Sequence, residues 1–285
     1  MKPCGTLLGF VLGLTGAGWV RAADLQPSTI QAWRDYIQTA KEQMSERLAP
    51  GHRFLWVDES PERLRKVREG AIVAQPAHER NPVPVPNGLI HDWMGAAFFP
   101  GVSLRDVFSV VRDYNRYKAV YKPEVVASTR LGHSANEDHF SMTVLNRALF
   151  ARTALESDYQ ESFFQVDDRR WYGISHTTRV QEVAGFGSSE EHLLPVGAGS
   201  GYIWRLFSIS RFEERDGGVY VELRAVALSR DIPASLRWLV NPIVRRVARS
   251  SLVTSLEQTR QAVRCTDEAE ERRESPAGYP ATLLK

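Results

Sequence analysis

The chain has 285 residues, of which 43% are hydrophobic and 25% are charged. These values are ordinary for a globular protein, and the length allows one large domain or one domain with an appendage. The 36 Lys and Arg residues nearly balance the 34 Asp and Glu residues, which leaves a net charge of +2. A nucleic-acid-binding protein would show a clear basic excess, so we expect no nucleic-acid partner.

Residues 1–22 have the three-part pattern of a secretory signal peptide. A basic start at Lys2 precedes the uncharged stretch "TLLGFVLGLTGAGW", and "VRA" (residues 20–22) places small residues at the cleavage positions. We predict an exported protein, periplasmic or secreted. The alternative is a membrane anchor, but the uncharged run is shorter than the ~20 residues that a span requires. The mature chain would have no transmembrane span and a single cysteine, Cys265, which excludes an internal disulfide.

Residues 23–87 predict a helical N-terminal extension followed by a proline-rich linker. Apolar residues recur at helical spacing over residues 28–48, after a candidate N-cap at Ser28. The stretches "FLWV" (residues 54–57) and "AIVA" (residues 71–74) predict short strands, with a second helix starting at Pro61 between them. Residues 75–88 hold four prolines and no helical period, which is typical of a linker or an extended edge.

Residues 88–265 predict one α+β domain. A strand over residues 89–99 is followed by a helix capped by Ser103 and by a short tyrosine-rich helix or turn. A meander of antiparallel strands then leads to the hairpin "WRLFSISRFEERDGGVYVELRAVALSRDIP", and the period changes to 3.6 after Pro233. Residues 266–285 are polar and are predicted to be a disordered tail. The long helix is the element able to cover one face of the sheet, and the curvature of the sheet would leave a gap beneath it.

This order of elements resembles the helix-grip superfamily of START-like and polyketide-cyclase-like (SRPBCC) domains. The resemblance is carried by the opening "GLIHDWMGAAFFPGVSLRDVFSVVRDYNRYKAVYKPEVVASTRLG", by the hairpin above, and by "PASLRWLVNPIVRRVARSSLVTSLEQTRQAV". Residues 24–80 lie outside it and resemble the N-terminal extension of an exported bacterial subfamily. The resemblance implies a curved antiparallel sheet wrapped around a long C-terminal helix, with a cavity for a lipid or other hydrophobic molecule between them. The resemblance does not by itself imply catalysis. Most members bind or carry ligands and some cyclise or hydrolyse them, and the fold alone does not separate these activities.

Two groups of side chains are candidates for the walls of that cavity, and each has an alternative. Apolar side chains on the strands and the helix would line it, or would serve as ordinary packed core. Tyrosines beside the first helix would form a gate at its mouth, or a turn whose hydroxyls contact water. The apolar group is Trp93, Trp204, Leu206, Phe212, Ile243 and Val247, and the tyrosines are Tyr114, Tyr117 and Tyr121.

Polar candidates are fewer. His91 and His176 lie on predicted strands and could face the cavity, although a lone strand histidine usually has a structural role. Arg230 and Asp231, at the end of a strand, could hold the polar end of a ligand. Glu222 and Arg224 are expected to face solvent on the outer side of the sheet. The glycine-rich loop over residues 185–201 is a lid or a solvated connection. No histidines are spaced as metal ligands, and no cofactor is expected.

Three functions remain open from the sequence. The first is binding or transport of a hydrophobic small molecule or lipid by a monomer, with transient contact to a membrane surface. The second is a cyclase or hydrolase on the same scaffold, although the chain has no recognisable catalytic motif such as GxSxG. It would need a polar pair, such as His91 or His176 beside a carboxylate, facing into the pocket. The third is a protein-interaction module with a collapsed cavity and an exposed apolar patch on the first helix.

Overall fold

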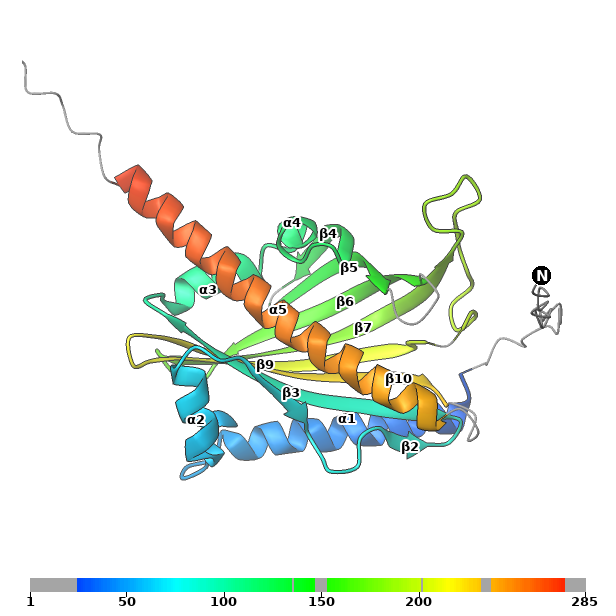
Figure 1. Ribbon diagram of the computed structural model, residues 1–285, viewed down its shortest axis with the longest axis horizontal. Helices are drawn as coiled ribbons and strands as arrows, with labels where there is room; N and C mark the ends of the chain where they lie inside the picture. The colour runs from blue at the N-terminus through cyan, green and yellow to red at the C-terminus, as the bar shows by residue number, and fades with distance from the viewer. Residues whose placement is uncertain (1–24, 135, 147–152, 201, 232–236, 275–285) are drawn as a thin grey trace, which may run out of the picture.

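The fold is a long, curved antiparallel sheet with helices on both faces (Figure 1). The computed structural model describes residues 25–134, 136–146, 153–200, 202–231 and 237–274. In this part of the chain the sheet has the strand order β1-β3-β10-β9-β7-β6-β5-β4, with β2 paired to β3 and β8 paired to β7. The strands are β1 (Val73–Pro76), β2 (Val83–Val85), β3 (Gly88–Pro100), β4 (Val125–Ser134), β5 (Glu137–Asn146), β6 (Thr153–Gln165), β7 (Arg170–Ala184), β8 (His192–Leu193), β9 (Arg205–Arg215) and β10 (Gly218–Arg230).

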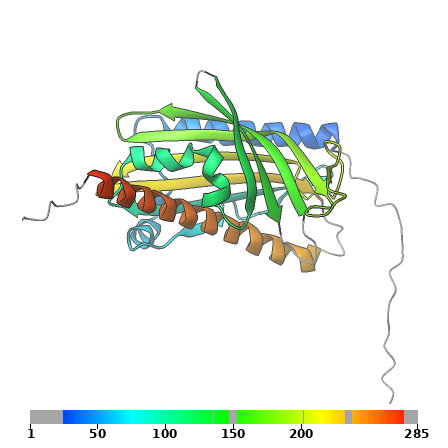
Figure 2. The ribbon, with the colours of Figure 1, turned by 90° about the horizontal axis from the view of Figure 1, so that it is seen from above.

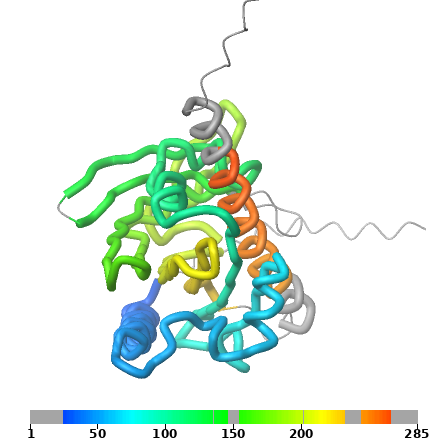
Figure 3. The backbone as a smooth tube through the Cα atoms, turned by 90° about the vertical axis from the view of Figure 1, so that its left-hand side faces the viewer, coloured from blue at the N-terminus to red at the C-terminus, as the bar shows by residue number. Residues whose placement is uncertain are grey.

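The helices lie on opposite sides of this sheet. Figures 2 and 3 show α5 along one face and α1 along the other. We call the side that faces α5 the inner face and the side that faces α1 the outer face. The helical elements are α1 (Pro27–Arg47), η1 (Val57–Glu59), α2 (Pro61–Arg68), α3 (Leu104–Val111), η2 (Tyr114–Arg116), α4 (Tyr117–Val120) and α5 (Arg237–Glu274).

Strand alternation assigns neighbouring side chains to opposite faces. On β10, Val219 and Val221 belong to the cluster that includes Leu256 of α5, whereas Tyr220 belongs to the cluster that includes Met44 of α1. The β9–β10 turn has positive φ at Asp216 (56°) and Gly217 (75°), as a tight hairpin turn requires. The hairpin therefore presents one apolar stripe to each helix, and the sheet is covered on both faces.

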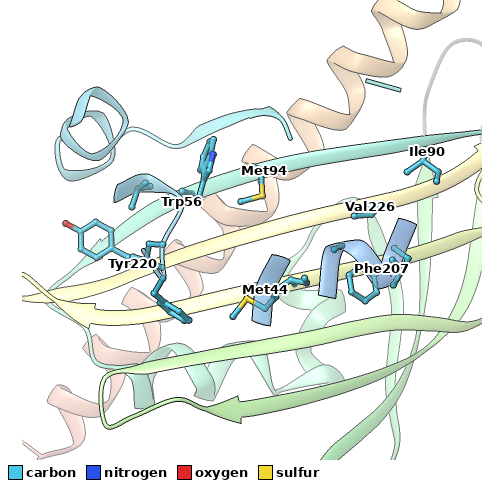
Figure 4. Close-up of a cluster of buried hydrophobic side chains, with 14 of the residues drawn as sticks. Met44, Trp56, Ile90, Met94, Phe207, Tyr220 and Val226 are labelled. Carbon is cyan, nitrogen blue, oxygen red and sulfur yellow. The ribbon is translucent and has the colours of Figure 1, made fainter. Parts of the chain in front are cut away.

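The outer-face core is built largely by the N-terminal extension. Side chains of α1 and of residues 54–57 pack with alternate residues of the central strands, and Figure 4 draws 14 members of this cluster and labels seven of them. They include Met44 of α1, Trp56 of the following segment and Met94 of β3. Burying such side chains contributes about 1.5–3 kcal/mol each. The extension is therefore an integral layer of the fold.

The inner face carries two separate clusters. One joins α3 and α5 to the ends of β3, β9 and β10, with Phe108 of α3 packed against Phe163 and Phe212. The other is aromatic and lies under η2 and α4, where Phe140 stacks between Tyr114 and Tyr159 at 4.3 and 4.8 Å. Between these clusters lies the centre of the sheet.

The predicted fold class is confirmed, because a curved antiparallel sheet grips a long C-terminal helix with a helical extension at the N-terminus. Ser103 caps α3, as predicted, and forms a capping box with Asp106, while Ser60 caps α2, whose first residue is Pro61 as predicted. Within the described residues, none of the helices has the length and apolar character needed to cross a membrane. The expected signal peptide over residues 1–22 lies outside the described residues.

Three local predictions differ from the structure, and one alternative is decided. The N-cap of α1 is Gln26, with Pro27 in the first turn, so Ser28 is already helical. The stretch "FLWV" is not a strand but leads into η1. Of the two alternatives for residues 75–88, the extended edge applies to β2, which pairs with β3. The last helix continues to Glu274, past the predicted end of the domain at residue 265.

Candidate functional site

The centre of the inner face is less buried than the outer face directly behind it. On the outer face, the side chains of Phe207, Ile209 and Val226 are only 3%, 2% and 1% exposed. Their inward-facing neighbours are only partly buried, although they lie on central strands beneath a helix; these neighbours are Leu206, Ser208, Ser210, Leu223, Ala225 and Ala227. Helix α5 contacts β1, β3, β10, α3 and α4. The centre of the inner face is therefore partly accessible to solvent and is not sealed by α5.

A row of polar side chains crosses this inner face. Register pairs Asp138 with Glu161, Glu161 with Ser175, and Ser175 with Ser208. The row continues from Ser208 to Ala225 and from Ala225 to Trp93. Directly opposed residues in a sheet point to the same side. The inner face thus grades from acidic at β5 and β6, through hydroxyls, to apolar at β10 and β3.

The acidic end of the row is organised around Tyr114. Its hydroxyl lies 2.9 Å from Glu161 Oε2 and 3.2 Å from Asp138 Oδ2. Burial would raise the pKa of Asp138, but hydrogen bonds and charges from Arg112, His133 and Arg130 outweigh it and hold that pKa below its usual value. Asp138 is therefore ionised and compensated at neutral pH.

Glu161 is in the opposite electrostatic situation. Burial raises the pKa of its carboxyl to about 7, even though the Tyr114 hydrogen bond and Arg112 act in the other direction. Its side chain is nevertheless partly accessible. Glu161 is therefore a partly accessible carboxyl at the polar end of the row.

The predicted tyrosines lie at this same end, but they do not form an exposed mouth. Tyr114 is fully buried and Tyr117 is 9% exposed. The Tyr117 hydroxyl donates to the Val111 carbonyl at 2.6 Å, and the Tyr121 hydroxyl bonds Thr259 of α5 at 3.0 Å. Tyr114 and Tyr117 therefore form neither the predicted gate nor a turn whose hydroxyls contact water. Their rings pack with Phe140 and their hydroxyls bond protein groups. Tyr121 is partly exposed.

The other apolar candidates divide between the faces. Trp93 and Leu206 are on the inner face beside Ala225 and Ala227. Phe212 is also on the inner face, but it is packed at 5.2 Å against Phe108 within the α3 cluster, away from the central strands.

Trp204 was predicted to line the cavity and instead belongs to the outer cluster. It precedes β9, so the alternation of that strand does not fix its direction. Val247 lies in α5 and is partly exposed. The side chain of Ile243, also in α5, lies outside the described residues.

The polar candidates also divide. His91 is on the inner face, where its Nε2 lies 2.9 Å from Ser229 Oγ, and burial lowers its pKa to about 4. His176 was expected to face the cavity but is exposed on the outer face, because its register partner is the outward Phe207. Arg230 is the last residue of β10 and Asp231 follows it, and both side chains are partly buried. Residues 232–236, which come next, lie outside the described residues. Neither histidine has a carboxylate partner on the inner face among the described residues.

Glu222 and Arg224 point to the outer face, as predicted, but they do not contact solvent. Glu222 is fully buried under residues 54–57, and Arg224 is 9% exposed. The extension was expected to pack against the domain as a helical cap, but that it buries Glu222 and Arg224 was not predicted. Glu161 was not predicted either, although an acidic residue between Tyr159 and Phe163 at period two was a usable signal. In the described part of the chain, no group of three or more His, Cys, Asp or Glu side chains is placed to hold a metal ion.

The chain was compared with known proteins and with solved structures. No protein-family model and no curated protein matches the chain. A STAR-related lipid transfer protein from Xanthomonas axonopodis is similar in structure, with 18% identity over 67% of this chain and 98% of that one and a TM-score of 0.43. Human STARD10 has 9% identity over 80% and 88% of the two chains, with a TM-score of 0.43. The Zhui aromatase/cyclase from a Streptomyces species has 12% identity over 66% and 98%, with a TM-score of 0.35. At these identities the similarity concerns the START-like fold alone.

Proposed function

We propose that this protein binds a hydrophobic small molecule or lipid in the space between the inner face of the sheet and α5. The observation that carries the proposal is the partial exposure of Leu206, Leu223 and Ala225, which contrasts with the near-complete burial of the outer face behind them. A small protein rarely leaves the apolar side of its central strands accessible beneath a helix, because burial of that surface would stabilise the fold.

Binding would be driven by removal of apolar surface from water, at roughly 25 cal/mol per Å2. Leu206, Ala227 and Trp93 would contact the apolar body of the ligand. Ser208, Ser175 and Glu161, in the polar row, would form hydrogen bonds with the polar end of the ligand. The mechanism is therefore desolvation with a directional polar contact at the β5–β6 side.

A second candidate function is a cyclase-type enzyme on the same scaffold, and the observation that favours it is Glu161. A carboxyl with a pKa of about 7 beside the Tyr114 hydroxyl can take up or release a proton at neutral pH. His91 does not supply the expected acid–base pair, since its contact is the Ser229 hydroxyl. The collapsed interaction module is disfavoured by the partly exposed inner face and by the burial of the apolar stripe of α1.

The location that we propose is outside the cytoplasm, after removal of residues 1–22, and we propose that the protein acts as a monomer that touches a membrane transiently. The loop between β7 and β9 supports membrane contact. Phe186, Leu193 and Val196 in this loop are 37%, 42% and 56% exposed. Apolar side chains presented together on a loop can insert among lipid headgroups. The same loop would then control ligand access.

The test is native mass spectrometry of the purified mature protein, followed by organic extraction and titration with fluorescent fatty acids and sterols. We expect a bound apolar molecule in the wild type. Ala225→Trp fills the centre of the inner face and should reduce binding by at least ~10-fold. His176→Trp adds the same ring to an exposed outer position of β7 and should leave binding unchanged. A wild type that is empty and binds no probe would contradict the proposal, as would equal effects of the two variants.

A further inference from the structure

A second cleft lies on the opposite side of the sheet from the proposed ligand space. Its volume is about 520 Å3, which is within the range of small-molecule sites. One wall is the C-terminal half of α1 with residues 51–53, and the floor is the outer face of β3, β9 and β10. The cleft therefore exists only because the N-terminal extension packs across the strands, and the helix-grip fold alone would not produce it.

The floor of this cleft carries two almost buried arginines. Arg211 is paired with Glu222 at 2.8 Å, with exposed side-chain fractions of 5% and 1%. Arg224 is paired with Asp92 at 2.7 Å, with fractions of 10% and 1%. Buried ion pairs contribute little net stability, because desolvation of both charges offsets their attraction. Two of them side by side at the base of a cleft therefore suggest a role other than stability.

The two arginines differ in how fully they are bonded, because Arg224 uses Nε and Nη2 on Asp92 and Nη1 on Gln43, whereas Arg211 has one nitrogen without a partner. Glu222 also accepts the backbone N–H groups of Trp56 and Val57 at 2.9 and 2.8 Å. Arg211 uses Nε and Nη2 on Glu222 and has no hydrogen-bond partner for Nη1 among the described residues. Nη1 of Arg211 is not among the buried nitrogens that lack a partner, so it keeps accessible surface, and Arg211 lines the cleft. Burial lowers the pKa of Arg211, more than Glu222 raises it, so an additional anion would stabilise its charge.

The rim adds an arginine that has no carboxylate partner. Arg47 and Arg53 line the cleft, and Arg47 pairs with Glu59, whereas Arg53 forms no ion pair among the described residues and its guanidinium donates to the Asp58 carbonyl. The other acidic residue of the lining is Glu46. Together with Glu222 and Asp92 behind the floor, four arginines and four carboxyl groups surround the opening, so the cleft offers a free guanidinium and no excess of positive charge. The apolar part of the wall is formed by Ala40, Met44, Trp56, Met94 and Ile209.

We propose that this cleft is a binding site for a small organic oxyanion, a carboxylate or phosphate monoester attached to an apolar group. The oxyanion would accept hydrogen bonds from Arg211 Nη1 and from the Arg53 guanidinium. The planar arrangement of N–H donors in a guanidinium suits carboxylate and phosphate oxygens. The apolar group would pack against Met44, Met94 and Trp56. The site is independent of the proposed ligand space, because the sheet separates the two.

Isothermal titration of the full mature protein with benzoate, phenyl phosphate and phenol tests this proposal. We expect at least one of the two anions to bind and phenol, which has the same ring without the charge, to bind at least ~10-fold more weakly. Arg53→Gln removes a rim charge without uncovering a buried carboxylate and should weaken anion binding by about 5-fold or more. Arg65→Gln, on the exposed side of α2 and away from the cleft, is the matched control and should have no effect.

Two further variants separate this site from the inner face. Ala225→Trp should leave anion binding intact, whereas Ala40→Leu narrows the cleft from α1 and should reduce it. Amide hydrogen exchange should slow over residues 43–56 when the anion is present. The proposal is overturned if neither anion binds at about 10 mM, if phenol binds as tightly as the anions, or if Ala225→Trp abolishes binding while Arg53→Gln does not.

Discussion

Glu161 and His91 lie on the same inner face, and burial shifts their pKa values in opposite directions. The pKa of Glu161 rises to about 7 and that of His91 falls to about 4, so both side chains favour their neutral forms in the folded protein. A space that is lined by neutral polar groups suits a ligand with an uncharged polar end. The charged forms of both residues are favoured on unfolding, because the unfolded chain is hydrated.

The pH dependence of stability tests this assignment for Glu161. Its folded pKa of about 7 is above the unfolded value of 4.5, so its contribution is fully present below pH 4.5 and is lost as the pH rises through 7. Relative to Glu161→Gln, the wild type should lose about 3 kcal/mol of unfolding free energy between these limits. Urea denaturation of both proteins across this range measures the difference.

His91 has the opposite sign, which is why the comparison must be made against the variant. Its folded pKa of about 4 is below 6.5, so its contribution is present above pH 6.5 and is lost as the pH falls through 4. The two effects partly cancel in the wild type. A stability difference between wild type and Glu161→Gln that is constant with pH would show that Glu161 is not perturbed by burial.

At the scale of elements, the distance between α5 and the sheet depends on Gly95 of β3. A Cβ atom at this position would lie 2.8 Å from Leu252 Cγ and 3.0 Å from Leu256 Cδ1. The absence of a side chain lets α5 approach β3 closely at one point, while the central strands curve away from it. This contact sets the height of the space above Ala225 and Leu206.

Gly95→Ala should therefore push α5 away from β3 and destabilise the protein by about 1–3 kcal/mol, as overpacking does. Thermal and urea denaturation measure this change. The matched control is Gly132→Ala on β4, where an added Cβ meets nothing within 4 Å and the backbone needs no positive φ. Equal stability changes for the two variants would mean that Gly95 does not determine how α5 packs.

At the scale of the whole molecule, the N-terminal extension completes the outer face. Glu222 on β10 accepts hydrogen bonds from Trp56 and Val57, and Arg215 pairs with Asp58 of the same segment. Tyr36 of α1 donates to Asp92 of β3 at 2.8 Å. Polar contacts from β3, β9 and β10 thus position a segment that is distant from them in sequence, and the apolar cluster around Met44 closes over them.

Glu222→Gln should destabilise the protein by about 3–5 kcal/mol, because Arg211 loses its buried partner and two backbone N–H groups share one remaining acceptor oxygen. Hydrogen exchange at Trp56 and Val57 should accelerate more than exchange at β6. Glu62→Gln on the exposed face of α2 is the control and should change neither measurement. Unchanged protection of Trp56 and Val57 in Glu222→Gln would contradict this role.

Local patterns in the sequence determined most of the architecture. The alternation in "VYVELRAVALSR", the turn at Asp216 and Gly217 and the helical period after Pro233 specified a hairpin followed by a long helix. They also assigned Glu222 and Arg224 to the face opposite Leu223, because successive side chains on a strand must alternate. These are properties of neighbouring residues, so they can be predicted without knowing what the element contacts.

Tertiary structure alone decided which side chains the outer layer buries. The alternation of residues along a strand could not show that α1 and residues 54–57 bury Glu222 and Arg224, that Trp204 belongs to the outer cluster, or that His176 stays exposed on that face. Nor could it bring Tyr114, Asp138 and Glu161 together, since these contacts join a 3-10 helix to strands that are distant in the chain. A face is defined by local geometry, but its burial depends on a partner element whose position follows from the packing of the whole chain.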